Sequence, residues 1–201
     1  TNDEDIFRQL LTLRNHGMTA DSSVFVNDDL AFEAADEANP WYYEMQQIGY
    51  NYRASAIHCA LGLSQLGKLD GFAARRRVLV ERYDRLLDGL SPMVRPLARV
   101  PGGVPAWHLY VVLIEFAAAG LTRRDLMERL RARGIGTQVH YIPVHEQPYY
   151  RGRYGHHELP GADAYYVRAL SLPLFPTMSD EDVDRVVGTL ENATANGGGE
   201  A

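Results

Sequence analysis

Two short stretches of the chain gather side chains that could do chemistry, and the first is GYNYR at residues 49–53. It places the Asn51 amide and the Arg53 guanidinium directly before a predicted helix. A guanidinium offers a planar fork of donors that matches a carboxylate or a phosphate, and a helix N-terminus favours anions. The stretch is therefore a candidate anion site, although an aromatic turn before a helix would have the same composition.

The second stretch, HYIPVHEQPYYR at residues 140–151, combines His140, Tyr141, His145 and further tyrosines with two prolines. A rigid loop of hydrogen-bond donors and flat rings suits a sugar or a nucleotide base. The alternative is a polar loop whose rings pack on the domain. Histidines five residues apart do not share a helix face, and no cysteine or carboxylate pair completes a ligand shell. We therefore expect no metal in this stretch.

Two further features carry less information by themselves. LRNHGM at residues 13–18 is typical of a helix end before Gly17 and indicates only a C-cap. Lys68, the only lysine, lies where an apolar helical pattern turns polar, so its spacing favours a solvated surface charge over a catalytic amine. The only cysteine, Cys59, has apolar neighbours, which favours a buried and inert thiol.

Composition excludes several classes of protein. With 46% hydrophobic and 23% charged residues, the chain is typical of a soluble globular protein, and no apolar run approaches the ~20 residues that cross a bilayer. The net charge is -6 and the arginines are scattered, so there is no basic stripe for a nucleic-acid backbone. We expect a cytoplasmic protein with neither nucleic-acid nor membrane partners.

Hydrophobic periodicity predicts the elements that must position the two stretches. A helix is expected over residues 6–13, followed by an irregular segment over residues 14–48. One long helix is predicted over residues 54–91, apolar on a wide face at first and on a narrower stripe later.

Beyond that helix, alternating strand and helix patterns predict a compact α/β domain over residues 92–190. The pattern indicates strands or extended segments at 107–116, 134–143 and 170–176, and helices that begin near Thr122, Gly161 and Ser179. Ile135, Val139 and Tyr141 are expected on one strand face, and Gly134 just after a helix end. The glycine-rich tail at 191–201 is expected to be disordered.

Taken in order and at their spacings, five motifs resemble the C-terminal half of the DegT/DnrJ/StrS-type nucleotide-sugar aminotransferases: LRNHGM, GYNYR, WHLYVVLI, GIGTQVHYIPVHEQPYY and ALSLPLFPTMSDEDVDRVV. The resemblance implies an α/β fold, the C-terminal part of a fold-type-I (aspartate-aminotransferase-like) transferase that uses pyridoxal 5'-phosphate (PLP). Residues 1–53 would be the end of the large PLP-binding domain with an active-site loop. Residues 54–91 would be an interdomain helix, and residues 92–190 the small domain.

Within the family, HYIPVHEQPYYR and SLPLFP are most similar to the branch that aminates the C4 ketone of a UDP-4-keto-6-deoxy-N-acetylhexosamine in pseudaminic acid biosynthesis. The resemblance implies a homodimer, with L-glutamate as the expected amino donor. It also implies that Asn51 contacts the cofactor phosphate of the other subunit and that Arg53 contacts an anionic group of donor or substrate. His140, Tyr141 and His145 would line the sugar-nucleotide side.

Relatives hold PLP as a Schiff base on a lysine upstream of the helix that corresponds to residues 6–13, and Lys68 does not match that position. We therefore expect the chain to be a truncated piece that contains no catalytic residue and is inactive by itself. It departs from its relatives near His58, where an acid or amide is usual. The alternatives are a perosamine-type or 3-keto-sugar aminotransferase, or a non-catalytic module that binds sugar nucleotides or serves as a partner subunit.

Overall fold

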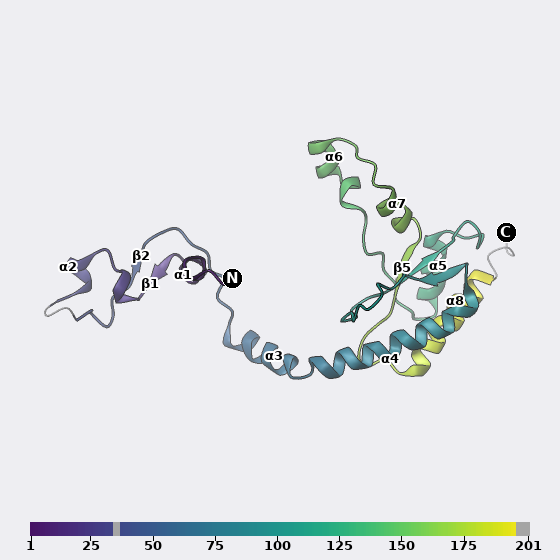
Figure 1. Cartoon of the computed structure of the whole chain (residues 1–201), viewed down its shortest axis with the longest axis horizontal. Coiled ribbons are helices and arrows are strands. Elements are labelled where there is room, and N and C mark those ends of the chain that lie inside the picture. The colour runs from purple at the N-terminus through teal and green to yellow at the C-terminus, as the bar shows by residue number, and fades with distance from the viewer. Residues whose placement is uncertain (34–36, 196–201) are drawn as a thin grey trace. The chain divides into compact units, whose positions relative to one another are not determined.

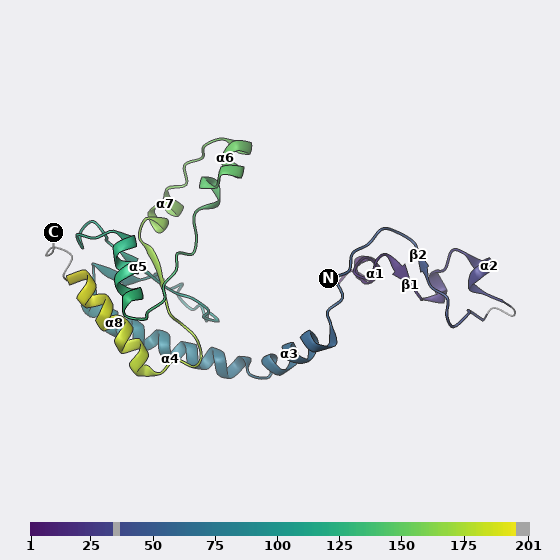
Figure 2. The ribbon, with the colours of Figure 1, turned by 180° about the vertical axis from the view of Figure 1, so that it is seen from behind.

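The chain divides between Leu66 and Gly67 into two units. The structure, a computed structural model, describes residues 1–33 and 37–195. Figures 1 and 2 show the elements of each unit from opposite sides. Because the placement of the units relative to one another is not determined, each is described by itself.

Unit 1 begins with α1 (Glu4–Leu13), which confirms the helix predicted over residues 6–13. The helix is capped by Asp3, whose side chain accepts a hydrogen bond from the backbone N–H of Ile6. The segment predicted to be irregular contains short elements: β1 (Met18–Thr19), η1 (Ser22–Val24), α2 (Asp28–Ala31) and β2 (Glu44–Met45). Strands β1 and β2 pair antiparallel, with Met18 opposite Met45.

Unit 1 has almost no hydrophobic core. Among its described residues, only Gly17 and Ala31 are buried. A small aromatic cluster forms instead, in which the Phe25 ring meets Tyr42 edge-on at 4.8 Å between centroids. Beside it, the Glu44 carboxylate accepts hydrogen bonds from several donors: Gln46, Tyr42 and the backbone of Val26 and Asn27. These hydrogen bonds lower the pKa of Glu44, and the one from Gln46 has the largest effect.

The structure has two helices where the sequence predicts one long helix. They are α3 (Ala56–Leu66), which ends unit 1, and α4 (Leu69–Leu87), which begins in unit 2. The interruption falls at Gly67, which has no side chain and carries a high entropic cost in a helix, and Lys68 is the N-cap of α4. No residue of α3 is buried, so Cys59 is exposed and the expectation of a buried thiol is wrong.

Unit 2 is built on an antiparallel sheet in the order β3-β4-β5. Its strands are β3 (Val94–Pro96), β4 (Tyr110–Ile114) and β5 (Ala169–Leu172), and every residue of β5 is buried. The strand predicted over residues 134–143 is wrong. Only Gln138 pairs there, in an isolated bridge with Ser171. No residue of the predicted strand pairs beyond Gln138, and Pro143 has no N–H with which to do so.

The helix-start signals of unit 2 are confirmed. At α5 (Arg123–Ala132), Thr122 and Asp125 form a reciprocal capping box, and Gly134 follows the helix with φ 73°. Ser179 and Asp182 exchange the same pair of hydrogen bonds at the start of α8 (Asp180–Ala195). Residues 191–195 of the predicted disordered tail are therefore helical, and residues 196–201 lie outside the described residues. Within the described ranges, no helix combines the length and apolar character needed to cross a membrane.

Two stacked tyrosines lie at the centre of the unit 2 core. Tyr83 from α4 and Tyr110 from β4 have ring centroids 4.5 Å apart and nearly parallel planes. Both hydroxyls are satisfied, since Tyr83 donates to the carbonyl of Pro173 at 2.9 Å and Tyr110 donates to Asp84 at 2.6 Å. Burial raises the pKa of both phenols, which keeps them as neutral donors.

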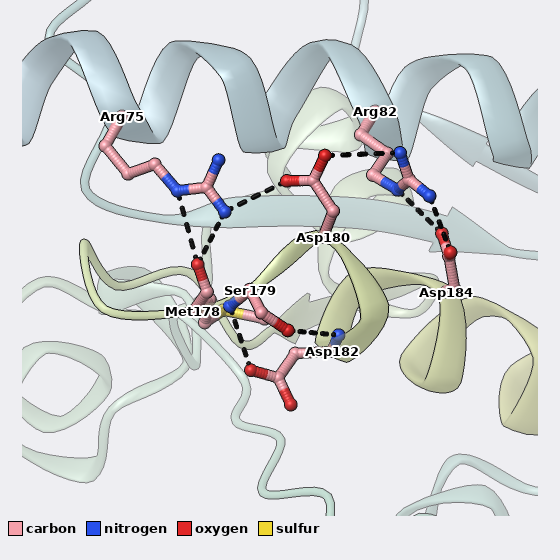
Figure 3. A network of polar contacts seen from close by, with 7 residues as sticks. All are labelled: Arg75, Arg82, Met178, Ser179, Asp180, Asp182 and Asp184. Carbon is pink, nitrogen blue, oxygen red and sulfur yellow. Dashed lines mark hydrogen bonds and ion pairs between the residues drawn. The ribbon is translucent and has the colours of Figure 1, made fainter.

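Helices α4 and α8 lie side by side (Figures 1 and 2) and are joined by a polar network (Figure 3). Arg75 donates to the carbonyl of Met178 and to Asp180. Arg82 binds Asp184 through two nitrogens, at 2.7 and 2.6 Å, and also reaches Asp180. The network fixes the start of α8 against the middle of α4, where these side chains are only partly exposed.

Candidate functional site

In unit 1 the structure brings LRNHGM and GYNYR together. Asn15 and Asn51 form an antiparallel bridge directly after α1. Three backbone hydrogen bonds accompany it: Tyr50 N to Leu13 O at 2.7 Å, His16 N to Tyr50 O at 2.8 Å, and Tyr52 N to Arg14 O at 2.9 Å. Two stretches more than thirty residues apart in the sequence are thus one short ladder.

Two glycines allow this close approach. Gly17 has φ 74°, and a Cβ added there would lie 1.7 Å from the carbonyl oxygen of Gln47. A Cβ on Gly49 would lie 2.2 Å from the backbone nitrogen of Gly17. Any side chain at either position would push the segments apart, so both glycines are required by the backbone path.

The ladder fixes Arg53 and leaves Asn51 open. The Nη1 of Arg53 donates to Asn15 Oδ1 at 2.7 Å, and its Nη2 lies 3.4 Å from His16 Nε2. The Asn51 side chain is exposed and takes part in none of the hydrogen bonds found among residues 1–33 and 37–195. An oriented guanidinium, two residues along the chain from an unused amide, can bind an anion such as a carboxylate or a phosphate.

The sequence identified Asn51 and Arg53 as site candidates but missed their neighbours. Asn15 and His16 were interpreted only as part of a helix end. Their contacts with Arg53 join positions 38 and 37 residues apart. The only sequence signal was indirect: two glycine-containing polar motifs, each next to a helix end.

In unit 2, His140 is anchored at the edge of the sheet. Its Nδ1 lies 2.7 Å from the hydroxyl of buried Ser171, and its carbonyl accepts a hydrogen bond from Tyr165 at 2.8 Å. The Tyr141 ring meets the His140 ring edge-on, with centroids 4.7 Å apart, and is 71% exposed. His140 is therefore a fixed group, whereas Tyr141 presents its ring to solvent.

The chain beyond Tyr141 forms an arm that extends from the sheet of unit 2 (Figures 1 and 2). The arm carries η3 (Val144–Glu146), α6 (Pro148–Tyr154) and α7 (Pro160–Tyr166). The helix predicted to begin near Gly161 is thus α7, which begins one residue earlier and ends before β5 begins at Ala169.

His145 is the polar centre of this arm. Its side chain is only 8% exposed, and its Nε2 donates to Asp163 Oδ1 at 3.0 Å. Glu146 Oε1 lies 3.7 Å from the same nitrogen, and Glu146 also pairs with Arg151 at 3.0 Å. These contacts join η3 to α7 across the arm.

His145, Glu146 and Asp163 also have potential ligand atoms within 4.8 Å of one another, close enough to share a cation. The sequence did not reveal this carboxylate pair because Asp163 lies 18 residues beyond His145. Each carboxylate already has a cationic or hydrogen-bonding partner within the arm. The contact of His145 with Asp163 and the ion pair of Arg151 with Glu146 hold the three side chains together.

A cavity of about 330 Å³ adjoins His145 in the arm. Its lining is largely aromatic and aliphatic: Val144, His145, Tyr150, Tyr154, Gly155, His157 and Leu159. The rings of Tyr150 and Tyr154 lie nearly parallel, 6.3 Å apart. The volume is near the lower end of the roughly 300–1,000 Å³ typical of small-molecule sites. Flat apolar walls with two imidazoles can hold a planar ring.

Curated proteins similar to the chain include the spore coat polysaccharide biosynthesis protein SpsC of Bacillus subtilis (strain 168). It is 37% identical over 190 residues, which are 93% of this chain and 46% of the relative. The chain thus spans about half the length of the curated relatives it matches.

Two solved structures extend the comparison. PseC of Helicobacter pylori, described as an aminotransferase involved in the biosynthesis of pseudoaminic acid, matches with a TM-score of 0.79 and 26% identity over 96% of this chain and 47% of its own. DesI, solved in the presence of its TDP-sugar product, matches with a TM-score of 0.76 and 27% identity over 98% of this chain and 45% of its own. The fold is therefore that of part of a fold-type-I aminotransferase.

The sequence profile of the DegT/DnrJ/EryC1/StrS aminotransferase family matches residues 1–191, nearly the whole chain. Members of this family are sugar aminotransferases that depend on PLP. The family profile and the structural likeness agree with the five motifs of the sequence. The chain belongs to the DegT/DnrJ/EryC1/StrS aminotransferase family.

Proposed function

We propose that the chain is the part of a PLP-dependent sugar-nucleotide aminotransferase that contributes anion and sugar-nucleotide contacts to the active site. The whole enzyme would transfer an amino group from L-glutamate to the C4 ketone of a UDP-4-keto-6-deoxy-N-acetylhexosamine, a reaction of the pseudaminic acid type. The observation that carries the proposal is the pairing of Asn15 with Asn51. It anchors the ladder in which Arg53, held by Asn15, follows the unused amide of Asn51 by two residues, in a chain of this family.

The residues of unit 1 fit the phosphate of PLP. An exposed amide and a guanidinium offer donors and positive charge, and hydrogen bonds between charged and neutral partners are among the stronger ones in proteins. In the proposed homodimer, Asn51 would donate to the cofactor phosphate of the other subunit. Arg53, held by Asn15 and His16, orients a carboxylate of the amino donor or an anionic group of the substrate.

PLP, when bound, supplies the electron sink that amino transfer requires. The chain's own contribution is binding and orientation, and we assign no catalytic residue to it. Lys68 is exposed between α3 and α4, and its side chain joins none of the hydrogen bonds or ion pairs of the described residues. We propose that Lys68 has no role as the Schiff-base lysine.

The sugar nucleotide would be bound by unit 2. His140 is fixed by Ser171, and Tyr141 presents an exposed ring beside it. His145 is fixed by Asp163 next to the aromatic cavity of the arm. The TDP-sugar of DesI and the pathway of PseC support a sugar nucleotide as the substrate class.

The test is the reaction of the whole enzyme with PLP, L-glutamate and three classes of ketone: a UDP-4-keto-6-deoxy-N-acetylhexosamine, a GDP-4-keto-6-deoxy sugar and a nucleotide-linked 3-keto sugar. Mass spectrometry of the products identifies which ketone is aminated. Preferential amination of the UDP-linked 4-ketone supports the proposal. Preference for the GDP-linked ketone would show a perosamine-type enzyme. Preference for the 3-ketone would show a 3-keto-sugar aminotransferase. Failure to aminate any of them, with tight nucleotide-sugar binding, would favour a non-catalytic module.

A further inference from the structure

A second cavity in unit 2, of about 840 Å³, belongs to none of the groups assigned above. We call it the α5 cavity, because most of its charged lining comes from that helix. Its apolar surface is provided by Phe116, Met127, Ile135 and Val167, and its charged groups are Arg123, Arg124, Glu128 and Arg131. Gly136 and Thr137 complete it.

Arg123 is the unusual group of the α5 cavity. Its guanidinium lies 4.9 Å from the centre of the Tyr166 ring and 5.7 Å from that of Phe116, and one nitrogen donates to the carbonyl of Tyr166. Its Nε is buried and has no hydrogen-bond partner. None of the ion pairs found in the described part of the chain includes Arg123.

The buried Nε of Arg123 thus lacks the hydrogen-bond partner that a buried donor normally has. Buried polar groups are nearly always paired, and an unpaired one calls for an explanation such as strain, a water molecule or an ion. A charged group loses more than a neutral one when its hydration is replaced by apolar neighbours. Arg123 therefore has a donor left over for a further acceptor, either water or a ligand.

The surrounding charges favour an anion as that acceptor. Three arginines line the α5 cavity against one glutamate, and Glu128 is already paired with Arg124 at 2.9 Å. Arg131 is exposed and forms no ion pair among the described residues. Arg123 and Arg124 also occupy the first turn of α5, where the helix dipole adds positive potential.

We propose that the α5 cavity binds a small organic carboxylate with an apolar body. The carboxylate would accept from Arg123 and Arg131, and the body would lie on Phe116, Met127, Ile135 and Val167. A volume of about 840 Å³ accommodates such a ligand, since drug-sized sites span roughly 300–1,000 Å³. The α5 cavity is a site additional to the proposed sugar-nucleotide contacts.

The experiment uses the ¹⁵N-labelled 201-residue chain and follows backbone amide shifts during titration with phenylacetate. Phenylacetamide serves as the neutral probe of nearly the same shape. We expect saturable shifts confined to residues that line the α5 cavity. Phenylacetamide should bind at least about tenfold more weakly, because it loses the charge-assisted contacts with the arginines.

Variants locate the site. Arg123→Gln and, separately, Arg131→Gln should each weaken phenylacetate binding by about tenfold or more. Arg131 is exposed, so its variant tests the site even where Arg123→Gln perturbs folding. Arg95→Gln, an exposed arginine of β3 outside the α5 cavity, is the matched control and should bind like the parent chain. Equal binding of the acid and the amide, shifts spread beyond the lining residues, or unchanged affinity in Arg131→Gln would overturn the proposal.

Discussion

The two units hold their candidate site residues in different ways. In unit 2, His140 contacts Ser171, whose strand β5 lies in a continuous hydrophobic core. In unit 1, Asn51 and Arg53 are held by a short ladder and side-chain hydrogen bonds, with only Gly17 and Ala31 buried among its described residues. The comparison indicates that unit 2 has its own source of stability, whereas the proposed anion site of unit 1 depends on local backbone contacts.

The largest expected effect comes from truncating one leucine in each unit. Leu126→Ala removes a fully buried side chain of α5 and should lower the free energy of unfolding of unit 2 by about 2–5 kcal/mol. Leu63→Ala, on α3 of unit 1, removes a side chain that is 73% exposed and should change the free energy of unfolding of unit 1 by less than about 0.5 kcal/mol. Urea denaturation followed by circular dichroism measures both. Similar losses in the two variants would contradict the contrast.

The second test asks whether the open amide of unit 1 serves binding. In the whole enzyme, Asn51→Ala should weaken PLP affinity by about 1.5–3 kcal/mol, or roughly 10–100-fold, because a hydrogen bond to a charged phosphate is lost. Equilibrium dialysis of the cofactor gives the affinity. Asn27→Ala is the matched control, since Asn27 is also exposed and its side chain does not cap α2. An Asn51→Ala enzyme with the affinity of the control would refute the assignment.

The third test breaks the ladder of unit 1 without touching its polar side chains. Gly17→Ala places a Cβ against the carbonyl of Gln47 and strains a residue at φ 74°, so it should destabilise the ladder by about 1–3 kcal/mol. Gly62→Ala, in α3 with open space around it, should be neutral or slightly stabilising. Hydrogen exchange at the Tyr50 and Tyr52 amides reports the result. Unchanged protection in Gly17→Ala would show that the ladder does not need this glycine.

The smallest effect concerns pH and the network between α4 and α8. The hydrogen bond from Arg82 lowers the pKa of Asp184, so the contact stabilises unit 2 above the unfolded pKa of about 3.9. That stability is lost as the pH falls through the lower folded value. Asp184→Asn should therefore show a smaller loss of stability between pH 5 and pH 2, as measured by thermal unfolding. Arg82→Gln should have the same effect, and the double variant should add nothing further; additive effects would show that the two residues act separately.

The sequence predicted best what is determined locally. The starts of α5 and α8 follow from Thr122, Asp125, Ser179 and Asp182, because a capping box acts within four residues. The sequence-based prediction fails where contacts between segments far apart in the chain determine the structure. The periodicity over residues 134–143 resembles a strand, but pairing ends after Gln138 because the chain turns into the arm. In the same way, periodicity alone could not show that Asp163 reaches His145 or that Asn15 reaches Arg53.

The central claim is that this chain supplies contacts to PLP and its substrates, and not the Schiff-base lysine. The most direct measurement is to incubate the 201-residue chain with PLP, reduce it with borohydride and locate pyridoxyl groups by mass spectrometry. We expect no stoichiometric adduct at Lys68, which should react no more than the N-terminal amine of Thr1. A stoichiometric adduct confined to Lys68, with the absorbance band of a PLP–lysine Schiff base before reduction, would contradict it.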